Sequence, residues 1–318
     1  MQPPSIWACY RSSGQNELPY PDQNPKDTTV MTPSPRPVAV AMLAGVLAWL
    51  AVAAGPVLQA QQPPSQQELL DRATAYSLGF VDRFSNVVAE ETYKQSTTRP
   101  KASRVLRSDL ALVRYPGATT WTMLRDVFEV DGKSVRDASQ QQRIMRLFTE
   151  TPRTAMGRAR EIADAGTRFN LVDIGNTNSP LLVLAFLQPE YRTHFRFNLA
   201  GIEKKLGPTI RIVRFVEFQR PTILKQGANS DLFSRGLIWI DEPSGRVVKT
   251  ELQLGPTMMP IRITTTFKFD EDLMLNVPAE MEDWYPDGDG EIKGLATYGK
   301  FRRFQVQTEE HTADPVKP

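Results

Sequence analysis

Short segments with a period of two, separated by turn residues, run through this chain from residue 86 to residue 308. They lie at 86–97, 104–115, 119–130, 191–202, 208–218, 236–241, 246–254, 260–269 and 294–308. Alternation of apolar and polar residues is typical of strands with one buried face. Turns such as Pro116-Gly117, Asp131-Gly132 and 242–245 join neighbouring segments directly, so the strands are expected to pair antiparallel.

Two regions have a helical period instead. In residues 66–84 the apolar side chains recur at steps of three and four: Leu69, Ala73, Tyr76, Phe80 and Phe84. Residues 139–190 form a helical insert, with one helix from Pro152 to near Gly166 and another after the N-cap pair Ser179-Pro180. We therefore predict an α+β fold: a curved, mostly antiparallel sheet, or half-barrel, with an N-terminal helix and the helical insert covering its concave face.

The first 60 residues carry an export signal. Arg36 precedes an uncharged, Ala-rich stretch from Val38 to Ala54, and a small residue follows at Ala60. These are the three parts of a secretory signal peptide, for which Met31 is the expected start. Cleavage near Ala60 would give a periplasmic or secreted protein. The alternative is an inner-membrane anchor formed by residues 38–58, since about 20 apolar residues suffice to span a bilayer.

Composition limits what the mature chain can do. Cys9 is the single cysteine and precedes the leader, which excludes disulfides and thiolate metal sites after cleavage. The net charge of +2 is too small to indicate a nucleic-acid partner. We divide the chain into an N-terminal extension and signal (1–60), a linker (61–65), one domain (66–308) and a flexible tail (309–318).

Residues that commonly carry catalysis are scarce. His194 and His311 are the only histidines, so neither a nucleophile–histidine–acid set nor a histidine metal site is expected, and we predict no catalytic residue and no cofactor. Asp287, Asp289 and Glu291 alternate as in a calcium loop but lack the rest of the twelve-residue pattern. They form either a Gly-rich turn or a weak metal site.

The segment Leu181–Leu187, LLVLAFL, is apolar all round and must be covered on every side. One interpretation is a core helix beneath the sheet. The other is a lid that closes a hydrophobic cavity and moves aside for a ligand. Under the second, the candidate ligand-binding residues are those of the segment and of the apolar strand face at 261–269. These are Leu181, Leu184, Phe186, Leu187, Phe267 and Phe269.

The order of elements and the run GLIWIDEPSGRVVKTEL, with Trp239 and Asp241, resemble the periplasmic lipoprotein carriers LolA and LolB and the N-terminal domain of the stress sensor RseB. The runs RDVFEVDG and ATYGKFRRF are similar to uncharacterised exported bacterial proteins. The first resemblance covers about residues 66–308 and implies an incomplete barrel with a helical lid and a cavity for acyl chains. No functional residue of that family is matched here.

These observations favour an exported, non-catalytic protein that binds a lipid or a lipoprotein acyl chain in the bacterial envelope. The alternative is an interaction or stress-sensing domain of the same fold with an envelope protein as partner. A hydrolase whose site assembles only in three dimensions is the third hypothesis.

Overall fold

The computed structural model describes residues 7–10, 64–85, 87–114, 121–136, 143–144, 146–147, 152–171, 178–226, 230–287 and 290–303. By its contacts the chain divides into residues 15–63 and a unit made of residues 1–14 and 64–318. The predicted signal peptide and anchor, the Pro116-Gly117 turn, His311 and the tail lie outside the described residues. Among the helices that are described, none is long and apolar enough to cross a membrane.

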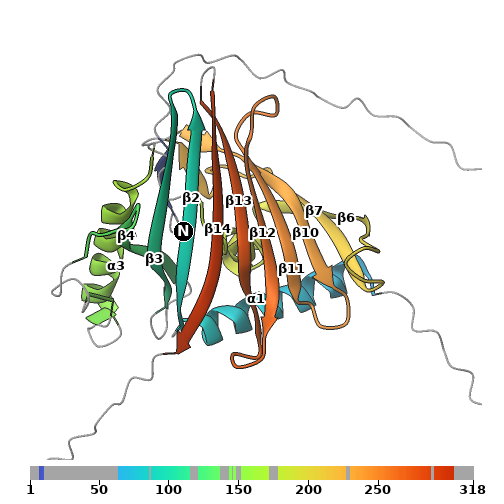
Figure 1. Ribbon diagram of the computed structural model, residues 1–318. Coiled ribbons are helices and arrows are strands. Elements are labelled where there is room, and N and C mark those ends of the chain that lie inside the picture. The colour runs from blue at the N-terminus through green and yellow to red at the C-terminus, as the bar shows by residue number, and fades with distance from the viewer. Residues whose placement is uncertain are drawn as a thin grey trace, which may run out of the picture. The chain divides into compact units, whose positions relative to one another are not determined.

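Among the described residues, eleven strands form one antiparallel sheet in the order β5-β4-β3-β2-β14-β13-β12-β11-β10-β7-β6. Their bounds are β2 (Val87–Thr98), β3 (Lys101–Arg114), β4 (Trp121–Val130), β5 (Lys133–Ser134), β6 (Phe195–Ile202), β7 (Ile210–Glu217), β10 (Ser234–Asp241), β11 (Val247–Leu254), β12 (Ile261–Asp270), β13 (Leu275–Asp287) and β14 (Gly290–Arg303). The sheet curves but does not close (Figure 1). The predicted α+β fold with a curved antiparallel sheet is confirmed.

The last strand lies in the middle of the sheet. β14 pairs with β13 on one side and with β2 on the other, so it joins the first strands of the chain to the last ones. A second, small sheet contains β8 (Leu224–Gln226), β9 (Ser230–Leu232) and β1 (Trp7–Tyr10), with β1 parallel to β8. The sequence analysis predicted none of these three short strands.

Helices pack on both faces of the main sheet. α1 (Gln66–Phe84), α4 (Leu182–Phe186) and α5 (Pro189–Arg192) contribute to the large core on one face, which we call the α1 face. α3 (Pro152–Thr167) packs with Val88, Ala111 and Leu124 in a second core on the opposite face. The predicted insert is therefore divided: its last part shares the face of α1, and α3 covers the other.

The start of α1 agrees with its sequence signals. Ser65 and Glu68 form a reciprocal capping box, which satisfies N–H groups that the first turn leaves free. Thr74 and Ser77 donate their hydroxyl protons to the carbonyl oxygens of Leu187 and Leu184, and this fixes the apolar segment against the helix.

The hairpin turn predicted at Asp131-Gly132 is confirmed. Both residues have positive φ, 48° and 78°, as a type I′ turn between β4 and β5 requires. By contrast, Ser179 is not the N-cap of a long helix. α4 begins after Leu181 without a side-chain cap, and the Ser179 hydroxyl accepts from the Leu181 N–H instead.

The sequence analysis also missed β13, the partner of both β12 and β14. Its pairing with β12 shifts by one residue between Thr266 and Phe267, opposite Pro278. A proline inside a strand is tolerated at such a bulge, and the bulge breaks the period of two that identifies a strand in sequence.

Candidate functional site

The structure places the predicted ligand-binding segment inside the core. Each side chain from Leu181 to Leu187 is at most 4% exposed. The Phe186 ring packs against Phe195 at 4.6 Å and Phe215 at 5.8 Å between ring centroids. The segment fills the space between α1 and the sheet. A ligand could therefore reach these side chains only if the segment moved out of the core.

The two phenylalanines of β12 are more exposed to solvent than the residues of this segment. Phe267 is half-buried at the margin of the large core, whereas Phe269 is 44% exposed. The structure therefore does not gather all six predicted residues into one site.

The Arg246 guanidinium lies 5.4 Å from the centroid of the Phe269 ring, on the surface of the sheet. Of the two phenylalanines, Phe267, next to the β12–β13 bulge, packs against the large core, and Phe269 does not. Both phenylalanines stay candidates for ligand contact.

Two of the three carboxylates weighed as metal ligands lie within the described residues. Asp287 is exposed and Glu291 is half-buried, while Asp289 lies outside the described residues. Within the part of the chain that the structure describes, no group of three or more His, Cys, Asp or Glu is placed to hold a metal ion. Glu90 and Glu91 point to opposite faces as expected: Glu90 contacts Arg107 and Lys300, and Glu91 contacts Arg125.

A hollow of about 730 Å³ lies on the face opposite α1, over five neighbouring strands. Two adjacent cross-strand rows supply its side chains. The first row is Arg262, Trp284, Lys293, Ser96 and Ser103, and the second is Thr264, Glu282, Leu295, Lys94 and Val105. Four inter-strand spacings of about 4.8 Å make the hollow about 19 Å long across the sheet. We call it the outer hollow.

The outer hollow combines an apolar surface with cations. Trp284 and Leu295 are half-buried on neighbouring strands, and Val105 is 36% exposed. The Arg262 guanidinium lies 5.0 Å from the Trp284 ring centroid, and the stems of Lys94 and Lys293 add further apolar surface. A surface of this kind suits a molecule with an apolar part and a negative charge.

The backbone between the two rows forms the floor of the outer hollow. This backbone belongs to Asp283, Gly294, Gln95 and Arg104. The side chains of Asp283, Gln95 and Arg104 point to the α1 face, because alternate residues of a strand point to opposite sides. There Asp283 accepts from the Tyr93 hydroxyl at 2.7 Å, and Gln95 donates to Asn170 at 2.9 Å. The hollow is thus backed by a buried polar cluster.

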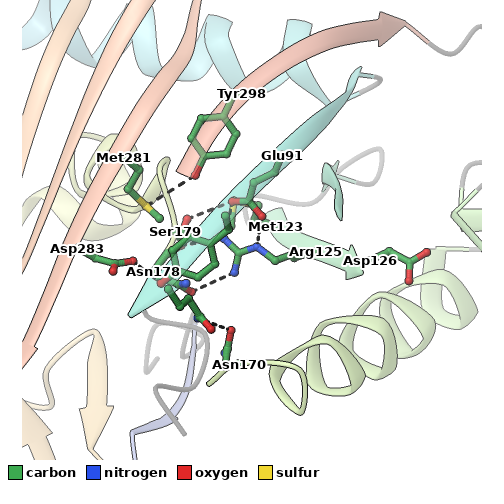
Figure 2. Close-up of polar contacts among 12 residues, drawn as sticks. Glu91, Met123, Arg125, Asp126, Asn170, Asn178, Ser179, Met281, Asp283 and Tyr298 are labelled. Atoms are coloured by element: carbon green, nitrogen blue, oxygen red, sulfur yellow. Dashed lines mark hydrogen bonds and ion pairs between the residues drawn. The ribbon is translucent and has the colours of Figure 1, made fainter. Parts of the chain in front are cut away.

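Arg125 and Glu91 form the charged centre of this cluster (Figure 2). The guanidinium contacts the carboxylate through two nitrogens, one of them Nη2 at 2.8 Å from Oε1, and donates to Asn178 Oδ1 at 3.1 Å. Arg125 is 8% exposed and Glu91 is fully buried. Because a buried charge requires a partner and hydrogen bonds, each ion depends on the other. Asp126, the next residue, points away toward α3 in the same view.

Burial shifts the pKa values of the groups around this ion pair. It raises the pKa of Asp283 to about 7, although the Tyr93 hydroxyl and the Arg125 charge oppose the rise. Burial also raises the pKa of Tyr93, with the neighbouring Asp283 carboxylate adding to the effect. For Arg125 burial acts to lower the pKa, but the Glu91 carboxylate outweighs it and the pKa is raised.

Gly294 is required at the centre of the floor. A Cβ atom at this position would lie 2.0 Å from Asp283 Oδ1 and 2.5 Å from the Tyr93 ring and hydroxyl. The Tyr93–Asp283 hydrogen bond therefore passes over the bare backbone of β14. Glycine in a strand interior commonly marks such a close approach.

The sequence analysis did not identify the outer hollow or the polar cluster. Lys94, Lys293 and Arg262 occupy polar positions of period-two segments, where a solvated face is the usual interpretation. Trp284 lies on the strand that was missed. A signal existed in Glu91, Tyr93 and Gln95, three polar-tipped residues on the side of β2 that also carries Val87 and Ala89.

No protein-family model matches the sequence, and no curated protein is significantly similar to it. Similar solved structures include a putative outer membrane lipoprotein-sorting protein domain from Vibrio parahaemolyticus (12% identity, TM-score 0.38, covering 76% of this chain and 95% of that one). A second is a LolA superfamily protein from Nitrosomonas europaea, with 11% identity and a TM-score of 0.32, covering 80% of this chain and 100% of that one. A third is a DUF1329 family protein from Desulfovibrio piger, with 10% identity and a TM-score of 0.37, covering 74% of this chain and 92% of that one. Likenesses at this level transfer no ligand to this chain.

Proposed function

We propose that this chain is an envelope protein that binds a hydrophobic or amphiphilic molecule, such as a lipid or an acyl chain, without transforming it. The observation that carries the proposal is the outer hollow. Its volume of about 730 Å³ falls in the range of ligand sites, roughly 300–1,000 Å³, which are mainly apolar with a few polar groups. The envelope location is supported by the predicted leader alone.

The chemistry of the hollow favours binding over catalysis. The titratable side chains that face it are Lys94, Lys293, Arg262 and Glu282, which suit charge recognition better than proton transfer at neutral pH. Among the described residues His194 is the only histidine, and it is 4% exposed and remote in sequence from every residue of the hollow.

The test is an equilibrium titration of the protein with a fluorescent long-chain fatty acid. Leu295→Glu places a charge among the apolar side chains of the hollow and should weaken binding at least tenfold. Leu237→Glu is the matched control, because Leu237 is also half-buried and lies further along the same cross-strand row, outside the hollow. Equal binding by both variants, or no uptake by the wild-type protein, would refute the proposal.

A protein-interaction role has one observation in its favour. Edge strand β6 exposes Leu199, and its neighbour β7 and the residue that follows it expose Val216 and Phe218, each by 41–48%. Exposed edges with apolar side chains are common places for another chain to pair. A photo-crosslinking residue in place of Phe218 should then capture one defined envelope protein in the native host, while the same residue at Lys268 captures none.

A further inference from the structure

A second hollow of about 640 Å³ continues the outer hollow toward the β2–β3 hairpin. The two share Ser96, Ser103 and Lys293. The second contributes Thr98 and Lys101, both exposed, and we call it the hairpin hollow. Together they form one groove that is apolar around Trp284 and Leu295 and rich in hydroxyls and lysines at the hairpin.

The contacts of Glu291 show that hydrogen-bond donors in this groove can bind a carboxylate. Its carboxylate accepts from Trp284 Nε1 at 2.8 Å and from Lys293 Nζ at 2.6 Å. Lys293, followed by Trp284, lowers the pKa of Glu291, so the carboxylate is ionised at neutral pH. An ammonium and an indole N–H that bind a carboxylate of the same chain offer the same contacts to the anionic group of a ligand.

The other end of the groove suits an anion less well. Arg262 lies over the Trp284 ring, where its charge is already partly balanced by the aromatic face. Glu282, in the second row, has the same sign as an anionic group and would repel it. Lys94, the other cation of this end, lies in the same cross-strand row as Glu282, with Leu295 between them. The hairpin end instead combines Lys101 and Lys293 with the hydroxyls of Ser96, Thr98 and Ser103, and these donors distinguish it.

Building on the proposed function, we propose that the groove holds a single-chain anionic amphiphile in one orientation. Its carboxylate or phosphate group lies between Lys101 and Lys293, with the hydroxyls of Ser96 and Ser103 as additional donors. Its hydrocarbon chain runs over Trp284 and Leu295. Without ligand, the Glu291 carboxylate accepts hydrogen bonds from Lys293 and Trp284. When the anionic group of the ligand binds, it displaces Glu291 from Lys293.

The experiment compares a long-chain fatty acid with the monoacylglycerol of the same chain, both measured by displacement of one fluorescent probe. The wild-type protein should prefer the fatty acid at least tenfold. In the double variant Lys101→Met, Lys293→Met the preference should fall to about twofold while monoacylglycerol binding is unchanged. Lys249→Met is the control, since that lysine lies on the same face over Trp239, outside both hollows.

Glu291→Gln is the sharpest variant, because it removes the competing carboxylate without removing a donor from the groove. It should strengthen fatty-acid binding several-fold and leave monoacylglycerol binding unchanged. A protein that binds both lipids equally would overturn the orientation and leave the proposed function intact, whereas a protein that binds neither would end both. Displacement of the fatty acid by millimolar inorganic phosphate, with monoacylglycerol retained, would indicate a site for small anions and would also overturn the proposal.

Discussion

The Leu181–Leu187 segment and the outer hollow are both rich in apolar atoms, yet they have opposite relations to water. The segment is seven consecutive apolar residues that α1 and the sheet enclose, each at most 4% exposed. The hollow takes single apolar residues from separate strands, Trp284, Leu295 and Val105, and sets them among Lys94, Lys293 and Arg262. A continuous apolar run indicates a place in the core, whereas an open apolar surface can be assembled from residues that are isolated in sequence.

The largest expected difference between the two regions is in folding stability. Phe186→Glu buries an unpaired charge in the core at a cost of several kcal/mol, comparable to the whole stability of about 5–15 kcal/mol of a domain. We expect this variant to unfold or to lose most of its cooperative melting transition. Leu295→Glu should melt close to the wild type. A folded Phe186→Glu protein with lost lipid uptake would instead support the lid interpretation.

The buried ion pair behind the hollow should come next in size. Arg125→Met leaves the Glu91 carboxylate buried without its counter-ion and should cost about 3–5 kcal/mol in urea unfolding. Replacing both residues, as Arg125→Met with Glu91→Leu, should recover most of the loss, because no uncompensated charge remains. If the double variant is no more stable than the single one, the pair does not act through mutual charge compensation.

A smaller effect is expected at the floor of the hollow. Gly294→Ala forces Tyr93 or Asp283 to move and should cost about 1–3 kcal/mol, as overpacking commonly does. Gly299→Ala on the same strand is the control, since nothing lies within 4 Å of a Cβ atom there. Gly294→Ala should also weaken fatty-acid binding, because the floor is shared between the two faces. Equal melting temperatures for both variants would contradict the close approach.

The last expected effect is a dependence of stability on pH, measured as a slope and not as the loss in one variant. The folded-state pKa values of Asp283 and Glu217 are both raised to about 7 by burial, above unfolded values of about 4. Between pH 4 and 7 the folded state therefore binds more protons than the unfolded state, and stability should fall as pH rises, by up to ~1.4 kcal/mol per pH unit for each group.

Urea unfolding at pH 5 and pH 7 checks this expectation with two variants. Asp283→Asn and Glu217→Gln should each remove part of the slope. Because Glu217 accepts from the Ile223 and Ser234 backbone N–H groups, remote from the hollow, only Asp283→Asn should alter the pH dependence of fatty-acid binding. If both variants show the same pH dependence of fatty-acid binding, the protonation of Asp283 in the polar cluster does not influence binding in the hollow.

Much of the fold could be predicted because its signals are local. α1 has its capping box and apolar face within residues 65–84, and the Asp131-Gly132 turn needs only its own backbone conformation. β13 escaped prediction because the bulge opposite Pro278 breaks its period. The groove could not be found at all, since it depends on the register that places Arg262, Trp284 and Lys293 side by side. Register between distant strands is set by the whole sheet.

The position of β14 has a consequence for how the chain is made. The strand is formed by residues 290–303, after every other described strand of the sheet, yet it pairs with β2 at residues 87–98 near the centre of the sheet. Until these residues arrive, β2 and β13 each present a free edge, and the groove lacks Lys293 and Leu295. Closing a loop of about 200 residues delays this pairing, as contacts distant in sequence generally do. The proposed ligand groove therefore lacks its central strand until residues 290–303 have been synthesised and have paired with β2.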